Sequence, residues 1–324
     1  MESQLARNRG YTHHGVKTCY RLITTICRPN GVISDTIPTV TAIRRTLDFL
    51  LLPLWLVLAA VVNVQAQSLP SGWTPYPTPK SGSETLRCAN YSIRREWRVS
   101  VSNGTLEIAV IPFERGGAQS QVFNKQELPA GIQRVKGMVG LQSTLKLQNG
   151  WLLGFDGGEF GGGLWFASDD GTTQILNREN VHGFVTTPQG VLVLAGLAHL
   201  TLDSGKVFIA PYVVKSSSDV KLLVDLDGAP QAFTKVSDDV MLVVTTRGVS
   251  RIRSSGGSEL LLRRDLGLLY PNSVAATPDG VIYVGARLFV VRLSPHDGDY
   301  IEQWMLPDSC THFEIQGLDC VCEK

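Results

Sequence analysis

A two-residue turn followed by a short apolar strand recurs about every 44 residues from residue 103 onward. The second residues of successive turns are 46, 40, 49 and 41 residues apart. Repetition on this scale restricts the fold strongly, because each repeat must bury its apolar strands against the next one. The turns are Asn103-Gly104, Asn149-Gly150, Gln189-Gly190, Asp238-Asp239 and Asp279-Gly280.

The last two repeats indicate that each unit holds four strands bounded by turn residues. Four strands in 40 to 50 residues are typical of a propeller blade. We therefore predict an all-β fold, a five- to six-bladed β-propeller of four-stranded antiparallel blades, with a two-sheet sandwich as the alternative. The expected strands are Gln231–Ser237, Val240–Thr245, Gly248–Arg253 and Glu259–Arg263, then Asn272–Thr277, Val281–Gly285, Arg287–Leu293 and Tyr300–Leu306.

The N-terminal region has the pattern of an export signal. Arg44 and Arg45 precede an apolar run, Phe49–Val62, and small residues occur before a cleavage site after Ala66. The run is shorter than the roughly 20 residues of a membrane span, so an uncleaved anchor helix is the alternative. The expected parts are a leader extension at 1–43, disordered or not translated, a signal peptide at 44–66, an N-terminal segment at 67–89 and the propeller at 90–324.

The charge and the cysteines fit a periplasmic or secreted protein. A net charge of +1 gives no reason to expect nucleic acid, and membrane contact follows only if the leader is uncleaved. Four cysteines follow residue 66: Cys88, Cys310, Cys320 and Cys322. A disulfide from Cys88 to a C-terminal cysteine would close the ring, with bridges confined to 310–322 as the alternative. Closure also predicts a composite last blade, built from 310–322 and the segment after Gln67.

One segment of the last repeat resembles a known blade motif. Pro271–Val284 reads PNSVAATPDGVIYV, which is similar to the PNG-x-x-x-S-P-D-G-x-x-Y-V motif of the SMP-30/gluconolactonase and NHL-like six-bladed propellers. In the lactonase branch, the resemblance implies that the Asn at position 272 binds a divalent metal in the central channel. The following strand usually ends in Asp in that branch, whereas here it ends in Gly285-Ala286.

The repeat also predicts a ring of polar side chains. The first strand of a blade lies nearest the axis, so equivalent residues at strand starts should border one mouth of the channel. Polar residues are also common where strands meet loops, which is the alternative explanation. The predicted ligand-binding positions are Gln142, His182, Gln231 and Asn272, with Glu96 as the least secure member.

A Gly-rich insert at 154–163 lies between the second and third strands of its repeat, on the same face as the ring. Its carboxylates, Asp156 and Glu159, suit a polar ligand or Ca²⁺, and Asn272 and Glu159 are the predicted metal ligands. A solvated turn is the alternative. No cofactor is firmly implied, and Ca²⁺ or another divalent cation is the candidate.

These features predict a module that binds an unidentified small molecule or protein, with a metal-dependent lactonase-like hydrolase as the alternative. A Gly-x-Ser-x-Gly elbow and a His-Glu-x-x-His motif do not occur, and no catalytic residue is assigned.

Overall fold

The chain divides into two units, Met1–Val64 and Gln65–Lys324, and the residues described here all belong to the second. The computed structural model describes residues 69–91, 96–111, 140–310, 313–316 and 319–322, and side chains are not described at 141–142 or beyond 310. The predicted leader extension and signal peptide or anchor helix lie outside these residues. Within the described part, no helix is long and apolar enough to cross a membrane.

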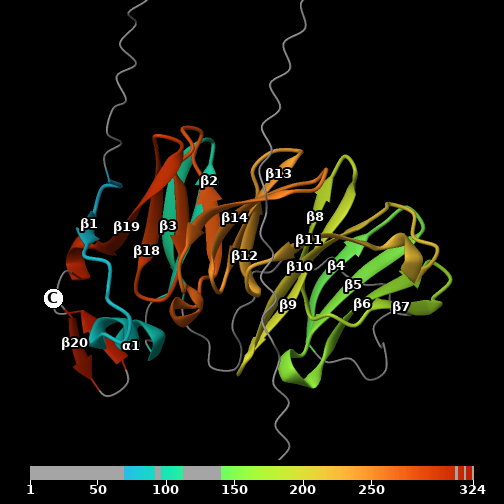
Figure 1. The fold of residues 1–324 in the computed structure, drawn as a ribbon, viewed down its shortest axis with the longest axis horizontal. Coiled ribbons are helices and arrows are strands. Elements are labelled where there is room, and N and C mark those ends of the chain that lie inside the picture. Colours follow the sequence, from blue (N-terminus) through green and yellow to red (C-terminus); the bar gives the residue numbers. More distant parts are fainter. Residues whose placement is uncertain (1–68, 92–95, 112–139, 311–312, 317–318, 323–324) are drawn as a thin grey trace, which may run out of the picture. The chain divides into compact units, whose positions relative to one another are not determined.

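The fold consists almost entirely of antiparallel sheets, as the repeat predicts (Figure 1). Four sheets each contain four consecutive strands that pair in chain order. The strands are β4 (Leu141–Lys146), β5 (Gly150–Asp156), β6 (Gly162–Ser168) and β7 (Thr173–Asn177); β8 (Val181–Thr187), β9 (Gly190–His199), β10 (Leu202–Ala210) and β11 (Lys221–Leu226); β12 (Pro230–Lys235), β13 (Val240–Thr245), β14 (Gly248–Arg253) and β15 (Ser258–Arg263); and β16 (Ser273–Ala276), β17 (Ile282–Gly285), β18 (Val290–His296) and β19 (Asp299–Pro307).

An earlier hairpin pairs β2 (Glu96–Ser102) with β3 (Thr105–Ile111). Its turn holds Asn103 at φ 49° and Gly104 at φ 76°. Positive φ at both central residues matches the twist of the flanking strands, which explains the Asn-Gly pair. The Asn-Gly motif therefore marks a hairpin, as predicted.

The first strands of neighbouring sheets lie beside one another: β4 contacts β8, β8 contacts β12, β12 contacts β16, and β16 contacts β2. Each of the four complete sheets then continues outward through its second, third and fourth strands. Innermost first strands are the arrangement of propeller blades. The fold is all-β and consistent with a propeller.

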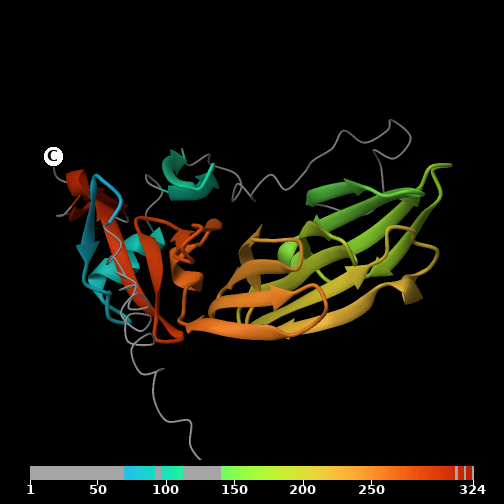
Figure 2. The same ribbon diagram turned by 90° about the horizontal axis from the view of Figure 1, so that it is seen from above.

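Within the described residues, the segment after Gln67 and the segment 310–322 do not pair into the predicted composite blade. Instead, β1 (Trp73–Tyr76) pairs with β19 and becomes the fifth strand of the β16–β19 sheet, as the two ribbon views show (Figures 1 and 2). Among the described strands, the C-terminal pair β20 (Phe313–Gln316) and β21 (Asp319–Cys322) forms a sheet of its own. Aromatic packing explains the position of β1, because Tyr76 contacts Phe289 and Phe289 contacts Trp304.

The described part contains one α-helix, α1 (Glu84–Tyr91), which packs against the β16–β19 sheet. Leu86, Cys88 and Ala89 join a core that includes Phe289 and Trp304. Cys88 and Cys310 are both disulfide-bonded, and α1 lies beside β21. Four short 3₁₀ turns complete the fold: η1 (Gly158–Phe160), η2 (Ser217–Asp219), η3 (Gly267–Leu269) and η4 (Asp308–Cys310).

Candidate functional site

The predicted polar positions lie at or next to the starts of the five first strands. Gln142 lies in β4, His182 in β8 and Gln231 in β12, whereas Asn272 directly precedes β16 and Glu96 begins β2. The side chain of Gln142 is outside the described residues. Gln142, His182 and Gln231 are each the second residue of their strand, whereas Asn272 and Glu96 are one residue earlier or more relative to the strand start.

His182 and Asp156 lie together, so the insert does share a face with a ring position. His182 Nδ1 is 3.5 Å from Asp156 Oδ2, and His182 Nε2 donates to the Gly196 carbonyl at 3.0 Å. Asp156 Oδ1 accepts the Gly158 N–H at 2.9 Å. Both groups are therefore engaged in holding the backbone of the insert and of β9.

Asn180, which the sequence analysis did not single out, anchors the insert to the start of β8. Its side chain is buried, accepts the Gly157 N–H at 3.2 Å and donates to the Gly158 carbonyl at 3.1 Å. A Cβ on Gly162 would lie 2.3 Å from Asn180 Oδ1, which explains the glycine there. A buried amide that bonds both a donor and an acceptor of one loop fixes its conformation. The only signal in the sequence is a polar residue directly before an apolar strand.

The two predicted metal ligands are not brought together. Glu159 Oε2 is 2.7 Å from His199 Nε2 at the end of β9. Asn272 Oδ1 accepts the Ser273 hydroxyl at 2.9 Å, beside β17. The β8–β11 and β12–β15 sheets separate the two positions. Among the described residues, no group of three His, Cys, Asp or Glu side chains could hold a metal ion.

The remaining ring positions have close partners. Gln231 Nε2 donates to the Pro230 carbonyl at 3.3 Å. Glu96 forms an ion pair with Arg287 at 2.9 Å, with both side chains largely buried. These two polar groups are held by the protein itself.

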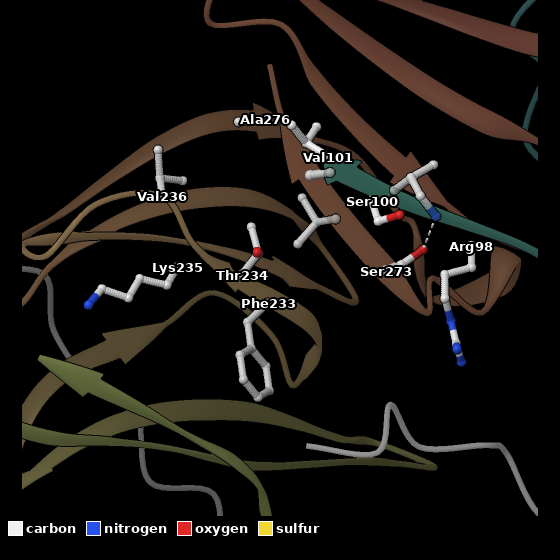
Figure 3. Close-up of a pocket in the computed structure, with 12 residues that line it drawn as sticks. Arg98, Ser100, Val101, Phe233, Thr234, Lys235, Val236, Ser273 and Ala276 are labelled. Atoms are coloured by element: carbon white, nitrogen blue, oxygen red, sulfur yellow. Dashed lines mark hydrogen bonds between the residues drawn. The ribbon is translucent and has the colours of Figure 1, made fainter. Parts of the chain in front are cut away.

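A cavity of about 610 Å³ is lined by residues of β2, β12 and β16 and by Val236. The polarity of the cavity lining differs between its two ends, as Figure 3 shows. Val101, Val236 and Ala276 lie at one end, and Arg98 lies away from them. Arg98 and Phe233 point the same way from their strands, while Lys235 extends away from both. The other polar lining groups are hydroxyls, namely Ser100, Thr234 and Ser273.

Arg98 is the charged group of this cavity that remains available. Among the described residues, its guanidinium has no hydrogen-bond or ion-pair partner, whereas Lys235 Nζ is 2.7 Å from Asp238 Oδ1. Glu96, two residues away on the same face of β2, forms an ion pair with Arg287. Arg98 is not among the residues predicted from the sequence. The alternation in 96–102, with Trp97, Val99 and Val101 between polar residues, is the signal that places it on the open face of the strand.

A second cavity, of about 570 Å³, holds three arginines, each of which already has a carboxylate partner. Arg247 pairs with Asp203 at 2.7 Å, Arg263 with Asp227 at 2.5 Å and Arg264 with Glu302. Burial raises the pKa of Asp203, but hydrogen bonds from Thr246, Arg247 and the Ala229 N–H outweigh it and hold the pKa below its ordinary value. These pairs join β10 to the turn before β14, the residue after β11 to β15, and the residue after β15 to β19, which is a structural role.

Of the known proteins compared with this chain, similar ones were found among solved structures only. No protein-family model matches the chain, and no curated protein matches it. A luciferin-regenerating enzyme is 10% identical with a TM-score of 0.35, over 53% of this chain and 64% of that one, so this chain spans less than two thirds of its length. Regucalcin from Agrobacterium tumefaciens, a calcium-binding protein, is 11% identical with a TM-score of 0.35, over 70% and 79%.

A gluconolactonase from Xanthomonas campestris is 10% identical with a TM-score of 0.33, over 72% of this chain and 88% of that one. The similar solved structures thus include members of the family that Pro271–Val284 resembles. Identities and TM-scores at this level assign no activity, and the ligands and reactions in these names belong to those proteins.

Proposed function

We propose that this chain is an exported five- to six-bladed propeller that binds a small molecule between its innermost strands. The observation that carries the proposal is the cavity of about 610 Å³ lined by β2, β12 and β16. Its volume falls within the range of small-molecule sites, which combine an apolar lining with a few polar groups. A protein partner at the polar strand starts is the other form of a binding role.

Three further features support the proposal. Five neighbouring first strands, β2, β4, β8, β12 and β16, support a ring of five to six blades. The leader pattern before Gln67 and the disulfide-bonded Cys88 and Cys310 favour an oxidising compartment. The polar positions Gln231, Asn272 and Glu96 stand at the starts of the strands that line the cavity.

The test is ligand-induced stabilisation of the purified exported protein. A panel of neutral polyols, sugars and small organic anions is screened by thermal unfolding, because a ligand that binds only the folded state raises stability by RT ln(1 + [L]/Kd). Ser100→Trp fills the cavity from an exposed lining position. Ser102→Trp, on the same face of β2 but outside the lining, is the matched control.

We expect a compound that stabilises the wild type and Ser102→Trp but not Ser100→Trp. Equal stabilisation of both variants contradicts binding in this cavity. A panel with no active compound at millimolar concentration contradicts a small-molecule role and favours a protein partner.

The alternative is a metal-dependent lactonase-like hydrolase, supported by Asn272 at the position that its motif predicts. In that case Ca²⁺ stabilises the wild type, and Asn272→Ala abolishes the effect. A bound ion together with such a shift would favour the hydrolase over the binding role.

A further inference from the structure

We propose that the ligand of the cavity among β2, β12 and β16 is a small carboxylate with an apolar portion, and that Arg98 binds its carboxylate group. This inference rests on the proposed binding function and adds the chemical class of the ligand. Three features of the cavity support it. Arg98 has no ion-pair partner among the described residues, the described lining contains no acidic residue, and one end of the cavity is apolar.

The charge of the lining favours an anion. Arg98 and Lys235 are its charged residues, and neither an Asp nor a Glu belongs to the lining that the structure describes. Lys235 already has Asp238 as its partner. Arg98 therefore supplies the charge that remains for a ligand, and guanidinium groups bind carboxylates through two parallel N–H···O bonds.

The acidic residues that the structure describes near Arg98 do not neutralise its charge. Glu96 is paired with Arg287. Glu107 lies opposite Ser100 on β3, diagonal to Arg98, and no ion pair joins it to Arg98. Since no carboxylate of the described residues lies within ion-pair distance of the exposed Arg98, its guanidinium can bind one from a ligand without breaking a contact seen there.

The rest of the lining favours an apolar body on the same ligand. Phe233 points the same way as Arg98, and Val101, Val236 and Ala276 form the opposite end (Figure 3). Phe233 is buried, so its ring is held rigidly by the core that it shares with Val243 and Ile252. An apolar group gains free energy in proportion to the area that it buries there. Inorganic anions and sugars lack such a group.

The experiment compares benzoate with benzamide, which has the same ring and nearly the same shape but no charge. Dissociation constants are measured by calorimetry at constant ionic strength for the wild type, Arg98→Gln and Arg178→Gln. Arg178 is an exposed residue between β7 and β8, so its substitution removes the same charge away from the cavity. Acetate and phosphate test the need for the apolar portion.

We expect benzoate to bind more tightly than benzamide, acetate and phosphate. Arg98→Gln should weaken benzoate by about 10- to 100-fold, since a hydrogen-bonded charge is lost, and leave benzamide unchanged. Arg178→Gln should bind benzoate as the wild type does.

Equal binding of benzoate and benzamide, or full benzoate binding by Arg98→Gln, overturns the inference. If neutral compounds bind in a manner that Ser100→Trp blocks, the proposed function still stands while the carboxylate inference fails. If nothing binds at all, both fail.

Discussion

The guanidinium of Arg287 donates through Nε to the carboxylate of Glu96 at 2.9 Å, across 191 residues of chain. The same guanidinium donates to the Asn90 carbonyl at 2.9 Å and stacks on the ring of Tyr270, 3.6 Å from its centroid. One side chain therefore joins the end of α1, the start of β2 and the residue after η3. This contact holds the first hairpin against the last complete sheet.

Replacing Arg287 with Met should destabilise the protein by about 1–3 kcal/mol, because the Glu96 carboxylate and the Asn90 carbonyl lose a buried donor. Urea denaturation measures the change. Glu96→Gln and the double variant complete a mutant cycle, and additive effects of the two substitutions would show that the pair contributes nothing of its own.

The repeat predicted much of this fold because turn residues bracket its strands. Val240–Thr245 and Gly248–Arg253 are expected from the turns beside them, and β13 and β14 have these same bounds. Helix α1 could not be predicted in this way. Leu86, Cys88 and Ala89 are buried in a core shared with residues of β16–β19, and a segment of eight residues is too short to form a stable helix without such packing.

The candidate site was only partly predictable for a related reason. The repeat register assigns a residue to a strand start, so the proximity of His182 to the insert follows from topology. It does not say which sheets are neighbours in the ring, and two sheets lie between Asn272 and Glu159. Whether a charge such as that of Arg98 is already paired depends on contacts distant in sequence.

Cys88 should form a disulfide with a cysteine of the C-terminal segment, since Cys88 is disulfide-bonded and α1 lies beside β21. A loop of this length gives a stabilisation on the order of 4 kcal/mol by restricting the unfolded chain. Non-reducing peptide mapping should yield a cross-link between the Cys88 peptide and one that contains Cys310, Cys320 or Cys322. Cross-links found only within 310–322 would contradict it.

Asn180→Ala should loosen the Gly-rich insert and cost about 1–3 kcal/mol, because Gly157 N–H and Gly158 C=O lose their buried partner. Urea denaturation gives the free energy, and limited proteolysis within 154–163 reports the loosening. His199→Ala removes a half-exposed pair with Glu159 from the same insert and should cost less than about 1 kcal/mol. If His199→Ala were the more damaging change, Asn180 would not be the anchor.

The Asp203–Arg247 pair should make the free energy of unfolding depend on pH in the acidic range. Burial raises the pKa of Asp203, but the hydrogen bonds from Thr246, Arg247 and Ala229 lower it by more than burial raises it. The pKa in the folded state therefore lies below the unfolded value of about 3.9. The stabilisation is complete above the unfolded pKa and is lost as the pH falls through the folded pKa.

The measurement is the free energy of unfolding in urea between pH 2 and pH 7 for the wild type and Asp203→Asn. The wild type should be more stable near neutral pH, and its advantage should shrink below pH of about 3.9. Asp225→Asn, an exposed carboxylate on β11, controls for the change in net charge. An advantage over Asp203→Asn that stays constant down to pH 2 would mean that Asp203 keeps one pKa in both states and that its hydrogen bonds do not favour the charged form.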